Sequence, residues 1–390
     1  MASANDNDVV IVEAVRTAVG RRGGSLSGTH AVVLLSQVLK ELMKRAGVDA
    51  SEVEDVISGC VDQVGEQSLN VARNAMLTAG FPYEVPATTV DRQCGSAQQA
   101  IHFAANLVQA GVCDVTIGCG VENMSRVPMG ANVSKDVGFP FPPELMSKYA
   151  LTSQGISAEM IAEQWGISRA DTDQFGYESQ MKAAQARDEG RFKKEILPID
   201  VTLEGVETTF DTDEGIRDTT TVEKLSTLNP PFKENGVHTA GNSSQISDGA
   251  AAVLLMSGKK AKELGVKPRA RIVAQAVVGS DPILMLTGPI TATPKVLDKA
   301  GLKLEDMDLV EINEAFAAVV LAWQKELSPD MSKVNVNGGA IALGHPLGCT
   351  GAKLMTTLLH ELERTDGQYG LQTMCCGGGL GTATIIERLN

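Results

Sequence analysis

Residues 46–57 read AGVDASEVEDVI, and residues 300–311 read AGLKLEDMDLVE. Both stretches begin with Ala-Gly, continue through an acidic turn and end in a short apolar run typical of a buried strand. They match at a shift of 254 positions, from residue 46 to residue 300. A repeat this long predicts that the chain folds as two similar halves.

The match extends outward from these two stretches. The turn that carries Cys94 corresponds to the junction at Gly348–Gly351, and the run ending at Gly118–Gly120 corresponds to the one ending at Cys375–Gly377. The alternative is that any two strand–helix stretches look alike. Because matching pairs occur in the same order, we interpret them as a duplication.

Apolar runs and helically spaced segments alternate in both halves, which predicts an α/β fold with a parallel-type sheet in each half. The predicted strands are residues 9–15, 53–58, 88–91, 114–120, 249–256, 271–278, 308–312, 333–337, 371–375 and 382–387. The predicted helices are residues 31–45, 71–79, 98–110, 158–165, 171–189, 293–300, 314–325 and 353–363.

Residues 122–245 differ in texture, with a Phe-Pro-rich stretch, two amphipathic helices and a long polar run. We interpret this region as a loop or lid domain inserted into the first half. The expected division is residues 1–268 for the N-terminal half with its insertion, and residues 269–390 for the C-terminal half. A length of 390 residues suits two or three domains.

Composition narrows the class of protein. A formal net charge of −14 argues against nucleic acid as a partner, because phosphates require a basic surface. We expect no secretory signal and no membrane span, since the start is polar and no apolar run is long enough. Seven cysteines, an odd number, favour free thiols in the cytoplasm. The absence of CxxC pairs and the five histidines disfavour a metal site.

Cys94 lies in the segment DRQCGSA, after a predicted strand and at the start of a predicted helix. The positive end of a helix stabilises a thiolate, so we expect the pKa of Cys94 to fall below about 8.5. Free backbone N–H groups at the same turn could bind an oxyanion. Taken alone, a buried and inert cysteine is the competing interpretation.

Three further polar groups follow predicted strands in the second half. His345 lies in a tight loop, because the five glycines between Gly338 and Gly351 disfavour a helix or strand. Cys375 precedes a glycine-rich turn, and Asn313 opens a predicted helix. Each could be structural, Asn313 as a helix cap. Because strand ends line the ligand crevice of α/β sheets, we expect these groups to converge with Cys94.

Four segments with these residues resemble motifs of the thiolase family, in the family's order: Gln93–Ser96, Asn313–Ala317, Gly344–Pro346 and Cys375–Gly381. The resemblance covers essentially the whole chain. It implies the five-layered αβαβα thiolase fold, with two duplicated halves and a loop domain inserted in the first. That expectation agrees with the repeat.

The resemblance also implies roles for the site residues. Cys94 would be the acylated nucleophile, His345 its activating base, and Cys375 the acid/base at the α-carbon. Asn313 would hold a water that, with His345, stabilises an enolate. The N–H groups of Cys94 and Gly377 would form a second oxyanion hole, for the tetrahedral intermediate.

Coenzyme A is the implied co-substrate, with no permanently bound cofactor. Ala240, Gly241 and Ser244 resemble the stretch that contacts pantetheine in the family. Phe316 resembles part of the pocket wall, and Arg217 resembles a residue near the CoA nucleotide. The implied partners are therefore acyl-CoA and CoA, and thiolases are dimers or tetramers.

The implied reaction is the CoA-dependent cleavage of 3-ketoacyl-CoA by a ping-pong route, as in β-oxidation. Acetoacetyl-specific biosynthetic thiolases have His-Met-Gly where this chain has Ser153-Gln154-Gly155. The smaller Ser153 favours longer or bulkier acyl groups. The alternatives are a biosynthetic thiolase, a ketosynthase-like enzyme, or a non-catalytic acyl-CoA-binding subunit. Three segments most resemble actinobacterial thiolases of sterol side-chain breakdown: residues 238–250, 271–279 and 334–351.

Overall fold

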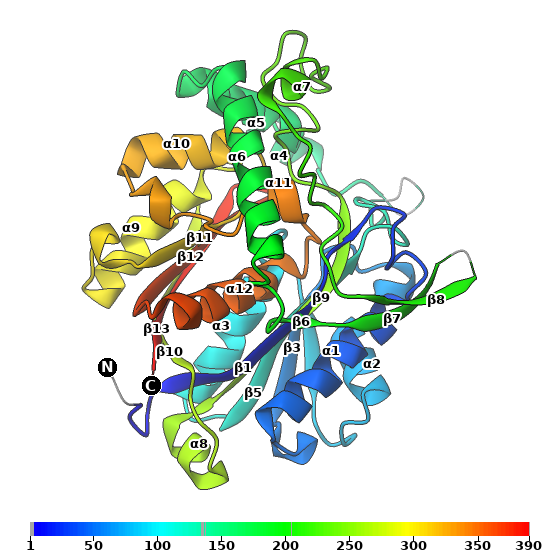
Figure 1. Cartoon of the computed structure of the whole chain (residues 1–390), viewed down its shortest axis with the longest axis vertical. Helices are drawn as coiled ribbons and strands as arrows, with labels where there is room; N and C mark the ends of the chain where they lie inside the picture. The colour runs from blue at the N-terminus through cyan, green and yellow to red at the C-terminus, as the bar shows by residue number, and fades with distance from the viewer. Residues whose placement is uncertain (1–3, 134–135, 137, 204, 390) are drawn as a thin grey trace.

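The structure is a computed structural model that describes residues 4–133, 136, 138–203 and 205–389. One main sheet runs through the molecule (Figure 1). Within these residues, eleven strands form one sheet along the path β11-β12-β13-β10-β1-β9-β5-β3-β4, with β2 and β6 paired beside it. The strands are β1 Val9–Thr17, β2 Gly20–Arg21, β3 Asp55–Gly59, β4 Ala87–Val90, β5 Val115–Asn123, β6 Ile196–Leu197, β9 Ser247–Ser257, β10 Ala270–Gly279, β11 Leu309–Ile312, β12 Tyr369–Cys376 and β13 Leu380–Arg388. Strands β7 Ile199–Leu203 and β8 Val206–Phe210 form a separate hairpin.

Helices cover both faces of this sheet. They also lie between its first part, β1, β3–β5 and β9, and its second part, β10–β13. They are α1 Ala31–Ala46, α2 Val71–Thr78, α3 Ser96–Gln109, α4 Pro143–Met146, α5 Gln154–Gln164, α6 Arg169–Asp188, α7 Val222–Ser226, α8 Gly258–Leu264, α9 Gly288–Ala300, α10 Ala317–Leu327, α11 Ala340–Leu343 and α12 Thr350–Thr365. Short 3₁₀ turns occur at Ala50–Glu52, Gly65–Gln67, Leu304–Asp306 and Met331–Lys333. Helix α1 packs on β1 and β9, α9 packs on β10 and β13, and α3 and α12 lie together between the two parts. The predicted five-layered arrangement is therefore present.

The sheet is mixed rather than parallel, so the predicted strand direction was wrong. Strands β3, β4 and β5 are parallel to one another, whereas β9 is antiparallel to both β1 and β5. The second part repeats this pattern, with β11 parallel to β12 and β13 antiparallel to its neighbours. Helices bury both faces of the inner strands β5, β9 and β13, and a strand buried on both faces has the same apolar sequence in either direction.

The strand predicted at residues 333–337 is absent, apart from one isolated bridge between Val310 and Val334. Asn335 adopts a left-handed conformation with φ 43°, which ends the extended run. Its side chain takes the place of a neighbouring strand: Oδ1 accepts from Ile312 N at 2.8 Å, and Nδ2 donates to Ile312 O at 2.9 Å. Strand β11 therefore ends against an amide side chain.

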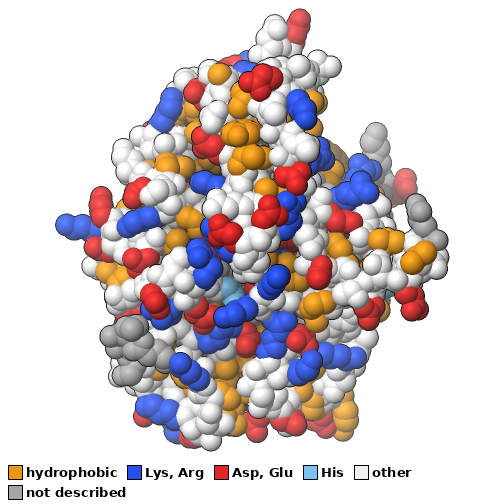
Figure 2. All heavy atoms as spheres, viewed as in Figure 1, with side chains coloured by type: hydrophobic (Ala, Val, Ile, Leu, Met, Phe, Trp, Pro, Cys, Tyr) orange, Lys and Arg blue, Asp and Glu red, His pale blue; other side chains and the backbone are white. Residues whose placement is uncertain are grey.

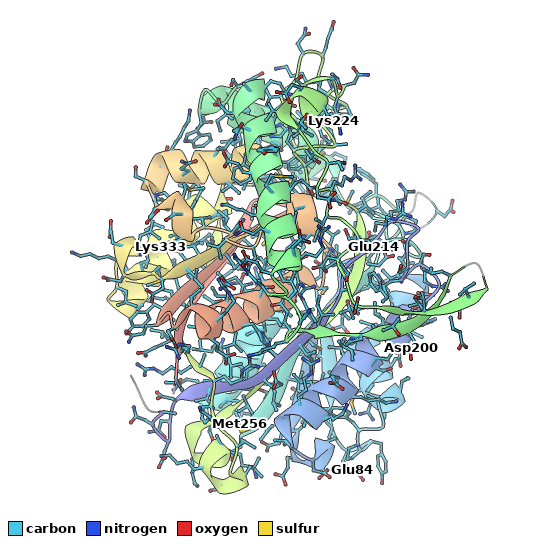
Figure 3. The ribbon with its side chains drawn as sticks, viewed as in Figure 1. Glu84, Asp200, Glu214, Lys224, Met256 and Lys333 are labelled. Carbon is cyan, nitrogen blue, oxygen red and sulfur yellow. The ribbon has the colours of Figure 1, made fainter. Side chains whose placement is uncertain are left out.

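The inserted region forms the upper lobe in Figure 1 through α5, α6 and α7, and between α6 and α7 it pairs with β1 of the sheet as β6. Figure 3 shows Lys224 of α7 in that lobe and Asp200 of β7 on the projecting hairpin. Arg16 of β1 anchors the region: its guanidinium donates to Glu195 at 2.6 Å and to Asp213 at 2.8 and 2.9 Å. All three side chains are buried, so the insertion is tied to the first half by an internal ion cluster.

Acidic and basic side chains are interspersed over the face shown in Figure 2, without a large area of one sign. Among the described residues, no helix is long and apolar enough to cross a membrane.

Candidate active site

Cys94 lies on the turn between β4 and α3, where the first half meets the second. Gln93 has φ 50° and Gly95 is the N-cap of α3, so the chain reverses sharply at the thiol. The N–H groups of Gly377 and of Cys94 itself point toward the sulfur. Two backbone donors, one from each half, therefore converge on this thiol.

Burial raises the pKa of the Cys94 thiol to about 11, although the N–H groups of Gly377 and Cys94 oppose this shift. The prediction that the pKa of Cys94 falls below about 8.5 was therefore wrong. The helix end is present, but desolvation of the thiolate outweighs it at a side chain that is 2% exposed. At neutral pH the free enzyme holds a thiol here, and ionisation requires a base or a bound substrate.

Cys375 lies at the end of β12, beside the turn that leads into β13. Gly378 and Gly379 both have φ 80°, a conformation that glycine adopts without a steric cost. The Asn313 side chain and the Ala315 N–H hydrogen-bond toward the sulfur. The pKa of Cys375 is raised by burial and by Cys94, so the two sulfurs are close enough to interact electrostatically.

His345 follows α11, a single helical turn within the predicted loop. Its backbone N–H donates to Gln245 O at 3.1 Å and to Ser247 Oγ at 3.2 Å. Its ring Nδ1 lies 2.6 Å from Thr350 Oγ1, and that hydroxyl donates to Pro346 O at 2.8 Å. A hydroxyl has one proton, so Thr350 must accept from His345 Nδ1–H. Nε2 is then the basic ring atom.

The Nε2 atom of His345 lies 3.5 Å from Nδ2 of Asn313. Burial, and to a lesser extent Lys353, lowers the pKa of His345 to about 3, so the imidazole is neutral at physiological pH. Asn313 is completely buried, and its Oδ1 accepts no hydrogen bond from the described residues. Asn313 thus connects His345 to Cys375, which in turn neighbours Cys94.

A buried carboxylate that the sequence did not reveal holds loops of both halves. Glu122 Oε2 accepts from Val61 N at 2.9 Å and from Gly348 N at 2.8 Å, while Oε1 accepts from Asp62 N at 3.1 Å and Gln67 Nε2 at 2.7 Å. Because Gly348 belongs to the loop after His345, the carboxylate fixes that loop to the end of β5. Thr350 was also missed, although its position five residues after His345 and at a helix start was a usable signal.

The residues expected to contact CoA lie mostly together. Ser244 N donates to Ala315 O at 2.9 Å, and Ala317 N donates to Asn242 O at 3.0 Å, so this stretch runs alongside Phe316. Phe316 makes edge contacts with Phe232 and His238 at centroid distances of 5.7 and 5.4 Å. The stretch includes Ala240 and Gly241, and Ser244 is half-buried. Arg217 is exposed, and its backbone N–H donates to Gln180 Oε1 at 2.7 Å.

The arrangement is suited to covalent acyl transfer. It combines two buried thiols, one neutral imidazole, and backbone donors at the sulfur of Cys94. A base that is neutral at physiological pH can take the proton of a thiol, and the donors can stabilise an oxyanion formed on carbon attached to it. A second thiol of raised pKa can supply a proton to a carbanion.

Comparison with known proteins gives consistent matches along the chain. The family model described as thiolase, N-terminal domain, matches residues 9–259, and the model for the thiolase C-terminal domain matches residues 266–388. A steroid 3-ketoacyl-CoA thiolase of Mycobacterium tuberculosis is 49% identical, with 98% of this chain and 94% of that protein covered. A 3-ketoacyl-CoA thiolase of Bacillus subtilis is 45% identical, with 97% and 99% covered. The crystal structure of an acetyl-CoA acetyltransferase from Bacillus anthracis has a TM-score of 0.92 and 42% identity, with 99% of this chain and 100% of that one covered.

Proposed function

The chain belongs to the thiolase family and is an acyltransferase, and we propose that it cleaves 3-ketoacyl-CoA with CoA to give acetyl-CoA and a shortened acyl-CoA. The observation that carries this proposal is the proximity of Cys94 and Cys375 from opposite halves, with Asn313 linking Cys375 to the neutral imidazole of His345. The many relatives of the 3-ketoacyl-CoA thiolase type support the degradative direction.

In the first half-reaction, Nε2 of His345 takes the proton of the Cys94 thiol, and the sulfur attacks the 3-keto carbon. The N–H groups of Cys94 and Gly377 stabilise the oxyanion, each donor contributing about 3–4 kcal/mol. Collapse breaks the bond between C2 and C3 and leaves the acyl group on Cys94. The enolate of acetyl-CoA takes a proton from the Cys375 thiol, and Asn313 with His345 stabilises its oxygen.

In the second half-reaction, the thiolate of Cys375 takes the proton of the CoA thiol, and the CoA sulfur attacks the thioester on Cys94. The Cys94 sulfur leaves and regains its proton from His345, so every group returns to its starting state. Ala240, Gly241, Ser244 and Phe316 would bind the pantetheine arm, and Arg217 would lie near the nucleotide.

Long or bulky acyl groups are the proposed substrates, including steroid-derived ones. The M. tuberculosis relative named as a steroid thiolase supports this, together with the small side chain of Ser153 at the start of α5. A biosynthetic acetoacetyl-CoA role is the less favoured alternative, because the M. tuberculosis and B. subtilis relatives are both named for 3-ketoacyl-CoA.

We further propose that residues 1–268 and 269–390 are the two halves, with residues 122–245 inserted, and that the protein works as a homodimer or homotetramer in the cytoplasm. All seven cysteines are free, which supports a reducing compartment.

The test is thiolysis by the purified protein. Short, medium and long straight-chain 3-ketoacyl-CoAs and steroid-derived ones are each mixed with CoA, and loss of the 3-keto enolate absorbance is followed. We expect cleavage, faster for the longer or bulkier groups. No cleavage of any of them would overturn the proposal.

A further inference from the structure

Gln154 is the first residue of α5, and its neighbours fix where it lies. Ser153 caps the helix through its side-chain oxygen. A Cβ on Gly155 would lie 2.1 Å from the Phe232 ring, so the helix packs too closely for any other residue there. Ser157 Oγ donates to Ile283 O at 2.7 Å, which ties the same turn to the second half. The position of Gln154 is therefore set by packing on both sides.

The side-chain amide of Gln154 lies beside Gly377. A Cβ placed on Gly377 would lie 3.0 Å from Gln154 Nε2 and 3.2 Å from Gln93 Oε1. The N–H of this same Gly377 points at the Cys94 sulfur. The amide of Gln154 is thus next to the position that an acyl group on Cys94 must occupy.

The two glutamines differ in their partners. Gln93 Nε2 donates to the carboxylate of Asp91 at 3.2 and 3.3 Å, so its amide is held in place. Within the described part of the chain, the side chain of Gln154 makes no hydrogen bond, and the residue is only half-buried. Nearby, Met285, Phe316 and Cys375 belong to one apolar cluster. Gln154 is therefore an unpaired polar group at the edge of an apolar site.

We propose that Gln154 is a specificity-determining residue that selects acyl groups carrying a second oxygen a few carbons beyond the 3-keto carbon. An apolar acyl chain covers the amide without replacing its bonds to water, whereas an oxygen on the chain accepts from it. The oxygen can be a carboxylate, a hydroxyl or a ketone, since all accept hydrogen bonds from an amide. This inference rests on the proposed function, and it names the substrate class of the same site.

The test compares three substrates of the same carbon-chain length: 3-ketohexanoyl-CoA, 6-hydroxy-3-ketohexanoyl-CoA and 3-ketoadipyl-CoA. The kcat/KM of each is measured for the wild type and for Gln154→Met, which keeps the side-chain length and removes the amide. We expect the wild type to prefer at least one oxygen-bearing substrate. Gln154→Met should shift that preference toward 3-ketohexanoyl-CoA by about ten- to hundredfold.

The ratio is taken within one preparation, so it does not depend on the fraction of enzyme that is folded. Gln154→Leu provides the same comparison if the Met variant does not fold. Gln164→Leu, at the exposed end of the same helix, is the matched control and should leave the ratio unchanged. The hydroxyl and carboxylate substrates show whether charge is needed.

The inference is overturned if both Gln154 variants keep the wild-type ratios within about twofold. Failure of the proposed function gives a different result, because the wild type would then cleave none of the three substrates. That result would also overturn the inference.

Discussion

Helices α3 and α12 occupy corresponding places in the two halves and lie side by side in the middle layer (Figure 1). The residues at the starts of the two helices nevertheless have different chemistry. Helix α3 begins at Ser96, two residues after Cys94, so the thiol lies on the turn that precedes the helix. Helix α12 begins at Thr350, whose hydroxyl holds the ring of His345. The duplicated scaffold thus has the Cys94 thiol before one helix and, at the start of the corresponding helix, a hydroxyl that orients His345.

The comparison also shows that a position near a helix start does not by itself determine whether a buried side chain is charged. Burial raises the pKa of Cys94 to about 11 and lowers the pKa of His345 to about 3. Both groups are neutral at physiological pH, so the resting site is a thiol and an imidazole rather than an ion pair. A charge appears only when the substrate brings the carbonyl that can accept it.

The largest effect is expected from replacing Cys94, the proposed nucleophile in the first half. Cys94→Ser should reduce thiolysis by about a thousandfold or more, because an alcohol ionises far less readily than a thiol. Loss of enolate absorbance measures the rate. A rate within tenfold of the wild type would mean that the first half does not supply the nucleophile.

Glu122→Gln should break the link between the two loops without touching the reacting atoms. The amide replaces one accepting oxygen by a donor that faces backbone N–H groups, leaving at least one of them unpaired. We expect stability to fall by about 1–3 kcal/mol in urea unfolding, and kcat to fall about ten- to hundredfold in the folded fraction. An unchanged kcat would show that the position of the His345 loop does not depend on this carboxylate.

Thr350→Val tests the role of the α12 start and should cost about tenfold in kcat, because Nδ1–H loses its acceptor and the ring can change tautomer. Thr350→Ser keeps the hydroxyl and should retain most of the rate. KM should change little for both, since the hydroxyl touches the histidine rather than the substrate. Equal rates for the Val and Ser variants would show that the Thr350 hydroxyl does not position His345 for the reaction.

The last prediction concerns the free enzyme alone. Alkylation of Cys94 by a small neutral reagent requires the thiolate, whose fraction increases with pH until the pKa is passed. With a pKa of about 11, the rate should continue to rise about tenfold per pH unit between pH 7 and 10. Cys94→Ala gives the background from the other cysteines. A plateau below pH 9 would show that the helix end outweighs burial.

The sequence predicted the fold well wherever a pattern depends on which residues are buried. The duplicated stretches at residues 46–57 and 300–311 lie where the repeat predicted, each leading into a strand, β3 and β11. The parallel direction predicted for the strands was wrong, because strands buried on both faces lack the alternation that would distinguish parallel from antiparallel pairing. The false strand at residues 333–337 arose because alternating valines, Val334 and Val336, are typical of a strand and do not reveal that Asn335 bends the backbone and pairs through its side chain.

The sequence supplied the candidate site residues, but it did not predict the pKa shifts that burial gives them. Cys375 interacts with Cys94 and with Asn313, and Asn313 lies 3.5 Å from His345, although only Cys94 and Asn313 follow strands. The pKa of Cys94 was predicted in the wrong direction, because desolvation depends on the whole fold and a local motif shows only the helix end. Glu122 was missed for the same reason, since its partners come from loops far apart in the sequence.

The central claim, that the nucleophile and the carbon acid/base come from different halves, is tested most directly with Cys375→Ser. This variant is incubated with acetyl-CoA, and the acetyl group is located by intact mass and peptide mapping. We predict one acetyl group on Cys94, with carbon–carbon bond formation and cleavage lost. An acetyl group found elsewhere, or full thiolase activity in this variant, would contradict the account.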